Sequence, residues 1–424
     1  MSVSRSVETL AQAALSVVDA DGVRFATLDD RFDGIAPLVI VAPRDAESAA
    51  GTLAWASRDK VPLAILGSGT KLAWGSPLRP VDVVLSTARL AAVVAHRYGD
   101  LTATVQAGVS LARVNRELGA HNQWIPLDPY RDDAATIGGV VATNDSGPRR
   151  HRHGAPRDLI IGMTMALADG RIARSGGIVV KNVAGYDMAR LMTGSLGTLA
   201  LILDATFKLT PVAAASRTVT ITTPSVSVLS HILAAIASSQ TMPTAVELET
   251  PPARLLVRFE SIERAAHQQA SELAVLASKH GARSEILTGD DESVVWRAHA
   301  ARPWNKTGCV IKIGLLPAQL ESLVEWLREA AGPADWELIG RAGVGVVLLR
   351  VDAKDEDLEP LIRQLQVRFK PGEGHASLVR ADADLKRRLG AVGSVGDSLR
   401  LMQTIKREFD PEGILNPGRG AGEY

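Results

Sequence analysis

The feature that most constrains this chain is a short apolar run that ends in a glycine-rich loop, within residues 62–75, PLAILGSGTKLAWG. Leu63 to Leu66 is too short for a helix and predicts a buried strand. The loop from Gly67 to Thr70 is either an ordinary tight turn or a cradle for phosphate oxygens, because glycines let backbone N–H groups approach an anion and hydroxyls add donors. A predicted strand (37–41) and helix (46–59) precede it, so the loop ends a β–α–β unit.

The composition is that of an ordinary globular protein, with 46% hydrophobic residues and no formal net charge, which argues against nucleic-acid binding. The 424 residues suffice for two or three domains. Cys309 is the only cysteine, so the chain forms no internal disulfide and cannot supply the cysteines of an iron–sulfur cluster. We find neither an apolar stretch of bilayer length nor a signal-peptide pattern. We therefore expect a cytoplasmic location, with contact to the inner membrane only through partners.

The first half of the chain continues with strand patterns and dense glycines. Ser110 is expected to cap a helix that runs to Leu118. Gly138 and Gly139 precede apolar residues and predict a turn that opens a tightly packed helix, within the turn-rich segment 126–147. Further strands are expected at 81–85, 101–106, 158–167, 178–183 and 199–209.

The second half shows a cleaner alternation of strands and helices, with a boundary at Thr210-Pro211. Two tandem β-α-β-β-α-β units are predicted, an order typical of an α+β domain whose sheet is backed by helices. The predicted strands lie at 218–222, 245–249, 255–260, 283–287, 309–315, 335–339, 344–351 and 375–380. The predicted helices lie at 226–238, 262–280, 292–301, 318–331, 356–369 and, in the tail, 400–409. We therefore divide the chain into an N-terminal helical segment (1–30), two domains (31–211 and 212–395) and a C-terminal segment (396–424).

Four segments taken together resemble one family. They are LGSGTKLAWG (66–75), PLDPYRDDAATIGGVVATNDSG (126–147), KNVAGYDMARLMTGSLGTLALILDATFKLTP (181–211) and FDPEGILNPGR (409–419). The set resembles the FAD-binding fold of the vanillyl-alcohol oxidase/p-cresol methylhydroxylase (PCMH) superfamily, and within it the FAD-binding subunits of bacterial glycolate oxidases. The resemblance implies an α+β fold class: a PCMH-type FAD-binding domain of two α/β subdomains, an α+β cap domain with the tandem units, and a C-terminal segment that returns to the FAD domain.

The resemblance also implies which residues hold the cofactor. The first loop would hold the FAD pyrophosphate, with Lys71 supplying positive charge, and the second segment would lie along the flavin. Gly138 and Gly139 would allow the ring to approach the backbone, unless they serve only to pack a helix against a strand. The expected FAD-binding residues are Gly67, Ser68, Gly69, Thr70, Lys71, Leu72, Pro126, Asp128, Thr136, Gly138, Gly139, Thr143, Asn144, Gly197, Ile202 and Asn416, and no metal site is expected.

Four positions bear on what the resemblance implies. Leu196 stands in GSLGT where the family usually has a glutamate, so one cofactor contact would be missing. Thr70 occupies the place where covalent relatives carry a histidine, so the FAD is expected to be noncovalent. Cys309 is expected to be a small buried residue in a strand and not a flavin attachment point. Asn416 lies in a tail that either caps the domain or returns to a ligand.

The catalytic residues are not assigned by the sequence. Related catalytic subunits and D-lactate dehydrogenases carry a motif H-x-G-D-G-N-x-H, and the segment 371–380, PGEGHASLVR, keeps only His375. Oxidation of a 2-hydroxy acid needs an arginine for the carboxylate and a base for the hydroxyl. Candidates are Arg297, His299, Arg302 and Lys306, with the alternative of a solvated helix face, and the cluster Arg149–His153, with the alternative of a solvated loop.

Three functions remain open at this point. In the first, the chain is the FAD-binding subunit of a heteromeric glycolate oxidase that oxidises glycolate to glyoxylate, with electrons passed to a second FAD subunit and an iron–sulfur subunit. In the second, it is a self-sufficient FAD-dependent dehydrogenase of the D-lactate type. In the third, it is a non-catalytic assembly module that uses the flavin fold as a scaffold.

Overall fold

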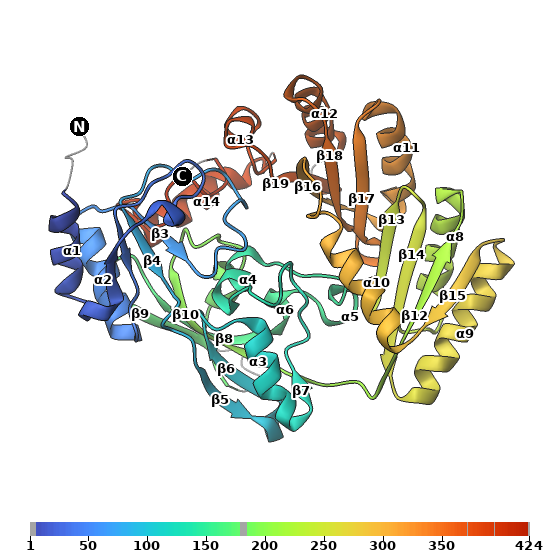
Figure 1. The fold of residues 1–424 in the computed structure, drawn as a ribbon, viewed down its shortest axis with the longest axis horizontal. Coiled ribbons are helices and arrows are strands. Elements are labelled where there is room, and N and C mark those ends of the chain that lie inside the picture. Colours follow the sequence, from blue (N-terminus) through green and yellow to red (C-terminus); the bar gives the residue numbers. More distant parts are fainter. Residues whose placement is uncertain (1–5, 179–184, 371, 394, 423–424) are drawn as a thin grey trace. The chain divides into compact units, whose positions relative to one another are not determined.

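The computed structural model describes residues 6–178, 185–370, 372–393 and 395–422, and the chain forms two compact units (Figure 1). Unit 1 comprises residues 1–145, 155–211 and 395–424, and unit 2 comprises 146–154 and 212–394. Nothing in the sequence signalled that the short segment 146–154 leaves unit 1.

The described part of unit 1 contains two larger sheets of different character and a small two-stranded sheet formed by β7 and β11. A four-stranded sheet has the order β1-β2-β4-β3, in which β4 pairs in parallel with β2 and β3. A five-stranded antiparallel sheet has the order β5-β6-β10-β8-β9. The strands are β1 (Val23–Phe25), β2 (Val39–Val41), β3 (Leu63–Leu66), β4 (Val83–Ser86), β5 (Val93–Arg97), β6 (Thr102–Gln106), β7 (Gln123–Trp124), β8 (Ile160–Ala166), β9 (Ile172–Gly176), β10 (Leu201–Lys208) and β11 (Thr210–Pro211).

Several helices of unit 1 begin at residues whose side chains cap them. The Ser110 hydroxyl accepts a hydrogen bond from the Arg113 N–H at 3.3 Å, which confirms the predicted helix cap. Thr136 caps the helix that Gly138 and Gly139 were predicted to open. The helices are α1 (Val7–Leu15), α2 (Ala46–Arg58), α3 (Leu111–Leu118), α4 (Ile137–Thr143), α6 (Pro156–Leu159), α7 (Met188–Met192) and α14 (Ser398–Phe409).

Unit 2 is built on one eight-stranded antiparallel sheet, ordered β15-β12-β14-β13-β17-β18-β16-β19. Each half of the sheet holds one predicted β-α-β-β-α-β unit, and the halves meet where β13 pairs with β17, so the tandem repeat is confirmed. The strands are β12 (Ala215–Thr222), β13 (Ala245–Thr250), β14 (Arg254–Ser261), β15 (Arg283–Leu287), β16 (Cys309–Leu315), β17 (Asp335–Arg341), β18 (Val346–Asp352) and β19 (Gly374–Arg380). The helices are α5 (Arg150–His153), α8 (Val226–Ser238), α9 (Glu263–Lys279), α10 (Gly289–Ala301), α11 (Leu320–Ala330), α12 (Asp355–Arg368) and α13 (Ala383–Leu389).

The two faces of this sheet differ because side chains alternate along each strand. One face packs an apolar core against α8, α9, α11 and α12. Leu320, Leu323 and Leu327 of α11 lie in that core, and Trp326 packs at its edge. The opposite face carries polar side chains, with only a small apolar cluster where Trp296 of α10 meets β13 and β14. In Figure 1, α10 lies on the opposite side of the sheet from α8 and α9.

Some elements were missed or misplaced in the sequence analysis. Strand β5, whose residues are partly or fully exposed, and strand β9, a sheet-edge strand, were not predicted, since neither shows a long apolar run. The strand expected at 158–167 begins later because α6, with proline at its first position, precedes it. The strand expected at 178–183 lies, apart from Ile178, outside the described residues. Within the described ranges, no helix is both long and apolar enough to cross a bilayer.

Candidate cofactor site

The glycine loop after β3 lines a cavity of unit 1. The space measures about 570 Å³ and is open to solvent, and a second space of about 410 Å³ adjoins it through shared lining residues such as Gly67 and Gly139. Of the expected FAD-binding residues, the two spaces are lined by Gly67, Ser68, Gly69, Thr70, Lys71, Leu72, Thr136, Gly138, Gly139, Thr143, Gly197, Ile202 and Asn416. The structure therefore brings together side chains that are more than 300 residues apart in the sequence.

The loop presents a row of unused donors. Within the part of the chain that the structure describes, the backbone N–H groups from Gly67 to Lys71 donate no hydrogen bond. Gly69 has φ +75°, a conformation that glycine adopts without strain. Consecutive free N–H groups at a positive-φ turn form a concave anion-binding surface. This local geometry fits the pyrophosphate of FAD, as expected from the resemblance.

Two glycines are also needed for packing, contrary to part of our sequence interpretation. A Cβ on Gly67 would lie 2.2 Å from Oγ1 of Thr136, so the loop rests directly on the start of α4. A Cβ on Gly138 would lie 2.9 Å from Cβ of Ala107, at the end of β6. Gly138 therefore packs α4 against the end of β6 and also lines the second cavity, while Gly139 lines both cavities.

The Lys71 ammonium already has partners within the chain. Its Nζ donates to the Tyr130 carbonyl at 3.1 Å and lies 3.4 Å from the Asp145 carboxylate. The side chain is 5% exposed, and burial lowers the pKa of Lys71 although Asp145 opposes that shift. In this arrangement Asp145 balances the positive charge that the sequence analysis assigned to the phosphate, and the backbone donors carry the anion-binding character of the loop.

Asn416 fixes the C-terminal tail against the cavity. Its Oδ1 accepts from the Ile65 N–H at 2.7 Å, and its Nδ2 donates to the Leu196 carbonyl at 2.7 Å. The Leu63 N–H donates to the Ile414 carbonyl at 2.9 Å, and the Asn416 N–H donates to the Leu63 carbonyl at 3.0 Å. The tail therefore runs beside β3 like an extra strand.

Two buried cations of the tail were missed in the sequence analysis. Lys406 of α14 lies 2.6 Å from the Asp410 carboxylate and donates to the carbonyls of Thr198 and Leu415 at 2.8 and 3.0 Å. Arg419 lines the larger cavity and donates to the carbonyls of Leu72 and Trp74. The signal available in the sequence was a basic residue three positions beyond Asn416, at the end of a segment that we had already singled out.

Three expected cofactor residues do not line either cavity. Pro126 is buried and Asp128 is half-buried, both in the loop after β7. Asn144 ends α4 with φ +48°, and its Oδ1 accepts from the Arg157 N–H at 3.5 Å. Asn144 therefore acts here as a helix C-cap, a role that its left-handed conformation explains.

The candidate catalytic residues of unit 2 are less exposed than the sequence suggested. His299 is 4% exposed, with Nδ1 2.7 Å from Glu249 and Nε2 2.9 Å from Glu247. Burial lowers the pKa of His299, but the two carboxylates outweigh burial and raise it. Burial likewise favours a higher pKa for Glu249, while His299 and nearby arginines bring it below its usual range. The solvated-face interpretation is wrong for His299, whereas Arg297 is exposed.

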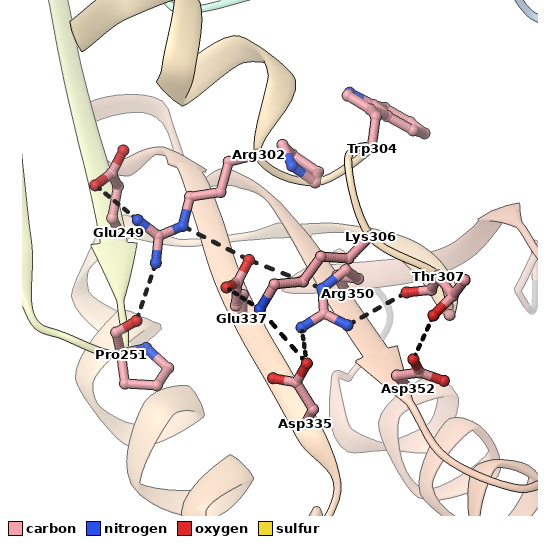
Figure 2. A network of polar contacts seen from close by, with 12 residues as sticks. Glu249, Pro251, Arg302, Trp304, Lys306, Thr307, Asp335, Glu337, Arg350 and Asp352 are labelled. Atoms are coloured by element: carbon pink, nitrogen blue, oxygen red, sulfur yellow. Dashed lines mark hydrogen bonds and ion pairs between the residues drawn. The ribbon is translucent and has the colours of Figure 1, made fainter.

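Beside His299 lies a closed network of ion pairs on the polar face of the sheet (Figure 2). Arg302 lies 3.3 Å from Glu249 and 3.6 Å from Glu337. Arg350 is fully buried, and its guanidinium lies 2.8 Å from Asp335 and 3.8 Å from Glu337. Lys306 also pairs with Glu337, at 3.2 Å. Every cation that Figure 2 shows in this network therefore has a carboxylate partner.

The basic cluster Arg149–His153 is not a solvated loop. Arg149 pairs with Glu260 at 2.8 Å, and its side chain is 21% exposed. Arg152 donates to the Met242 carbonyl at 3.2 Å. The ring of His151 lies against Gly343, where a Cβ would be 2.4 Å from Nδ1. His375, the remnant of the catalytic motif, lies opposite Gly314 in the sheet-edge strand β19. The described residues include no group of three or more His, Cys, Asp or Glu side chains arranged to hold a metal ion.

Comparison with known proteins agrees with this geometry. Residues 37–176 match the profile of an FAD binding domain, and residues 394–419 match the C-terminal domain of FAD linked oxidases. The chain is 25% identical to glycolate oxidase subunit GlcD of Bacillus subtilis, over 90% of this chain and 88% of the relative. It is 28% identical to glycolate oxidase subunit GlcE of Escherichia coli, over 85% of this chain and 93% of the relative.

A solved structure shares this fold. The 4-ethylphenol oxidase from Gulosibacter chungangensis superposes with a TM-score of 0.74 at 16% identity, covering 98% of each chain. Identity this low supports the fold alone, and the fold is the one that the sequence predicted. Each of the two profiles matches a part of this chain, and the architecture that they and the solved structure share is the PCMH-type FAD-binding fold.

Proposed function

We propose that this chain binds FAD noncovalently in the cavity of unit 1 and takes part in the oxidation of a small 2-hydroxy acid, glycolate to glyoxylate, as the FAD-binding subunit of a heteromeric glycolate oxidase. The observation that carries the proposal is the row of free backbone N–H groups from Gly67 to Lys71 along that cavity. The names of the two glycolate oxidase subunits, each similar over most of this chain, supply the substrate class.

Each part of the site has a physical task in this proposal. The first loop binds the pyrophosphate through backbone donors, and the Ser68 and Thr70 hydroxyls add to them. Gly139, Thr143 and the tail residue Asn416 line the space available to the rest of the cofactor. When bound, FAD supplies an acceptor for the two electrons removed from the substrate.

Noncovalent attachment is supported by the chemistry of the nearby side chains. The side chain in the loop position used by covalent relatives is Thr70, and its hydroxyl accepts a long hydrogen bond from the Lys71 ammonium, which is not an activating base. Cys309, the only thiol, is buried in unit 2, where burial raises its pKa to about 12. A thiol with such a pKa forms almost no thiolate at neutral pH and is a poor nucleophile.

The partner proteins are proposed because electrons on a reduced flavin need an acceptor. A chain with one cysteine holds no cysteine-ligated cluster of its own, so electrons from a reduced flavin would pass to other subunits, here a second FAD subunit and an iron–sulfur subunit. A cytoplasmic complex, at the inner membrane only through those partners, remains our prediction.

The test is a purification followed by reduction. We expect the chain to purify with the visible absorption band of oxidised flavin, and acid precipitation to release FAD into the supernatant. Flavin that stays with the precipitate would contradict noncovalent attachment, and a colourless chain that still assembles with partners would favour the assembly-module alternative.

A second experiment separates subunit from self-sufficient enzyme. Anaerobic glycolate or D-lactate is added to the chain alone and to the chain co-expressed with both partners. Bleaching that requires the partners supports the heteromeric proposal, whereas full bleaching by D-lactate in the isolated chain supports the self-sufficient dehydrogenase. Buried polar atoms of Arg341 and His151 in unit 2 lack a hydrogen-bond partner among the described residues, and this observation favours the second candidate.

A further inference from the structure

Among the described residues of unit 2, seven buried side-chain atoms have no hydrogen-bond partner. Four of these atoms, on Arg302, Glu337 and Arg350, lie within ion pairs, and three do not. These three are Nε of Arg341, Nδ1 of His151 and Oε1 of Glu247. Leaving such an atom unsatisfied in a folded protein is unfavourable. Their clustering therefore points to a ligand that supplies the missing partners.

The three atoms come from elements that lie next to one another. Glu247 of β13 is directly opposite Arg341 of β17 in the strand register. His151 of α5 packs against Gly343, two residues after Arg341, where the absence of a side chain makes room for the imidazole. The charge of Glu247 also acts on His151. The atoms therefore belong to one site, contained within unit 2.

Arg341 differs from the other cations of this face. Arg302, Lys306 and Arg350 are all paired with carboxylates (Figure 2). Among the described residues, the Arg341 side chain makes neither a hydrogen bond nor an ion pair, although it is half-buried. Its cross-strand neighbour Glu247 is instead bonded to His299 at 2.9 Å. The positive charge of Arg341 is thus left for an anion from outside the chain.

His151 complements that charge with an acceptor. Burial lowers its pKa, although Glu247 acts in the opposite direction, so the ring is neutral near pH 7 and one ring nitrogen can accept a hydrogen bond. Glu247 of β13 is the charge that acts on the ring. Arg341 of β17 lies opposite Glu247 in the strand register, and Arg149 is already paired with Glu260. An arginine donor beside an imidazole acceptor is complementary to a carboxylate that carries a neighbouring hydroxyl group.

We propose that Arg341 and His151 form the binding site for the 2-hydroxy acid, with Arg341 holding the carboxylate and His151 accepting the hydrogen bond of the C2 hydroxyl. Glu247, fixed by His299, orients the histidine from behind as a positioning residue. This assignment rests on the proposed function for its substrate class. The hydroxyl proton held by His151 is the one that must leave when C2 becomes a carbonyl.

The site is tested by binding, apart from turnover. The probe is 2-hydroxyisobutyrate, a 2-hydroxy acid that has no hydrogen on C2 and cannot be oxidised, and isobutyrate lacks only the hydroxyl. Calorimetric titration of the purified chain should show tighter binding of 2-hydroxyisobutyrate. Arg341→Gln should weaken both acids at least tenfold, the scale of one charge-assisted hydrogen bond. His151→Gln should remove the preference for the hydroxyl and leave isobutyrate binding unchanged.

Two controls separate binding from folding. Arg297→Gln removes an exposed arginine of α10 and should change neither affinity. Because Arg341 has no side-chain partner among the residues that the structure describes, Arg341→Gln should keep the thermal unfolding midpoint of the wild type, and Arg341→Lys should recover part of the carboxylate affinity. The assignment would be overturned if Arg341→Gln bound the acids as tightly as the wild type, or if the wild type bound neither acid. Ordered water would then supply the hydrogen bonds that the three atoms lack.

The experiments also distinguish a failure of this site assignment from a failure of the proposed function. Flavin reduction by glycolate with an unchanged KM in Arg341→Gln would keep the function and reject the site. Selective binding of 2-hydroxyisobutyrate without any flavin reduction by glycolate, alone or with partners, would keep the site and reject the function.

Discussion

The contact between the glycine loop and the start of α4 can be tested by a double-mutant cycle on Gly67 and Thr136. A Cβ on Gly67 would lie 2.2 Å from Oγ1, 3.2 Å from Cβ and 3.3 Å from Cγ2 of Thr136. Rotation of the threonine cannot relieve this overlap, since its Cβ and both substituents are close. We expect Gly67→Ala to destabilise unit 1 by about 1–3 kcal/mol, the range for overpacking a tight interior, and to weaken FAD retention.

The double-mutant cycle measures the free energy of coupling between the two substitutions. Thr136→Ala removes the hydroxyl that caps α4, at a cost of about 1 kcal/mol. Because it also removes the worst overlap, the double variant should be less destabilised than the sum of the single variants, by about 1–2 kcal/mol. Urea unfolding followed by tryptophan fluorescence measures each free energy. Gly119→Ala, where a Cβ meets nothing within 4 Å, is the matched control. Strict additivity would show that the loop does not rest on Thr136.

The remaining predictions concern buried charges. The raised pKa of His299 means that its bonds to Glu247 and Glu249 stabilise the fold fully below pH 6.5 and less as pH rises through the folded pKa. His299→Gln should flatten that decline in urea midpoints above pH 6.5, and parallel profiles would contradict the assignment. Lys406→Met should destabilise unit 1 by about 3–5 kcal/mol, because Asp410 would remain buried without its cation. Adding Asp410→Asn should recover part of that loss, and no recovery would argue against the ion pair. The Cys309 thiol should resist a disulfide reagent until urea unfolds the chain, whereas prompt modification would contradict its burial.

The sequence was sufficient for the architecture because hydrophobic periodicity and turn residues act locally. The strand β16 and the helix α8 have the predicted bounds, since a clear apolar pattern ends there at polar or turn residues. The tandem order of unit 2 followed from the same signals. Edge strands such as β5 were not predicted because a half-exposed strand shows little apolar pattern.

The site was predictable only in part because its residues meet through tertiary contacts. The loop Gly67–Lys71 carries its own signal, but the pairing of Lys71 with Asp145 depends on how the segment after β7 folds back. His299 looked like a surface residue since its partners, Glu247 and Glu249, are 50 or more positions away. The orphaned nitrogen of Arg341 could be recognised only once all possible partners were placed.

The central claim is that the loop after β3 binds the pyrophosphate of FAD, and a pair of variants at Gly69 tests it most directly. Gly69→Asp and Gly69→Asn add side chains of equal size, and both must adopt φ +75°, which asparagine and aspartate tolerate better than most residues. They differ only in charge. Two unit charges about 5 Å apart interact by roughly 3 kcal/mol at an effective dielectric constant near 20, so FAD should bind the aspartate variant at least about 100-fold more weakly than the asparagine variant. The measurement is the FAD dissociation constant of each variant by fluorescence titration. Equal dissociation constants for the two variants would contradict the placement of the pyrophosphate at this loop.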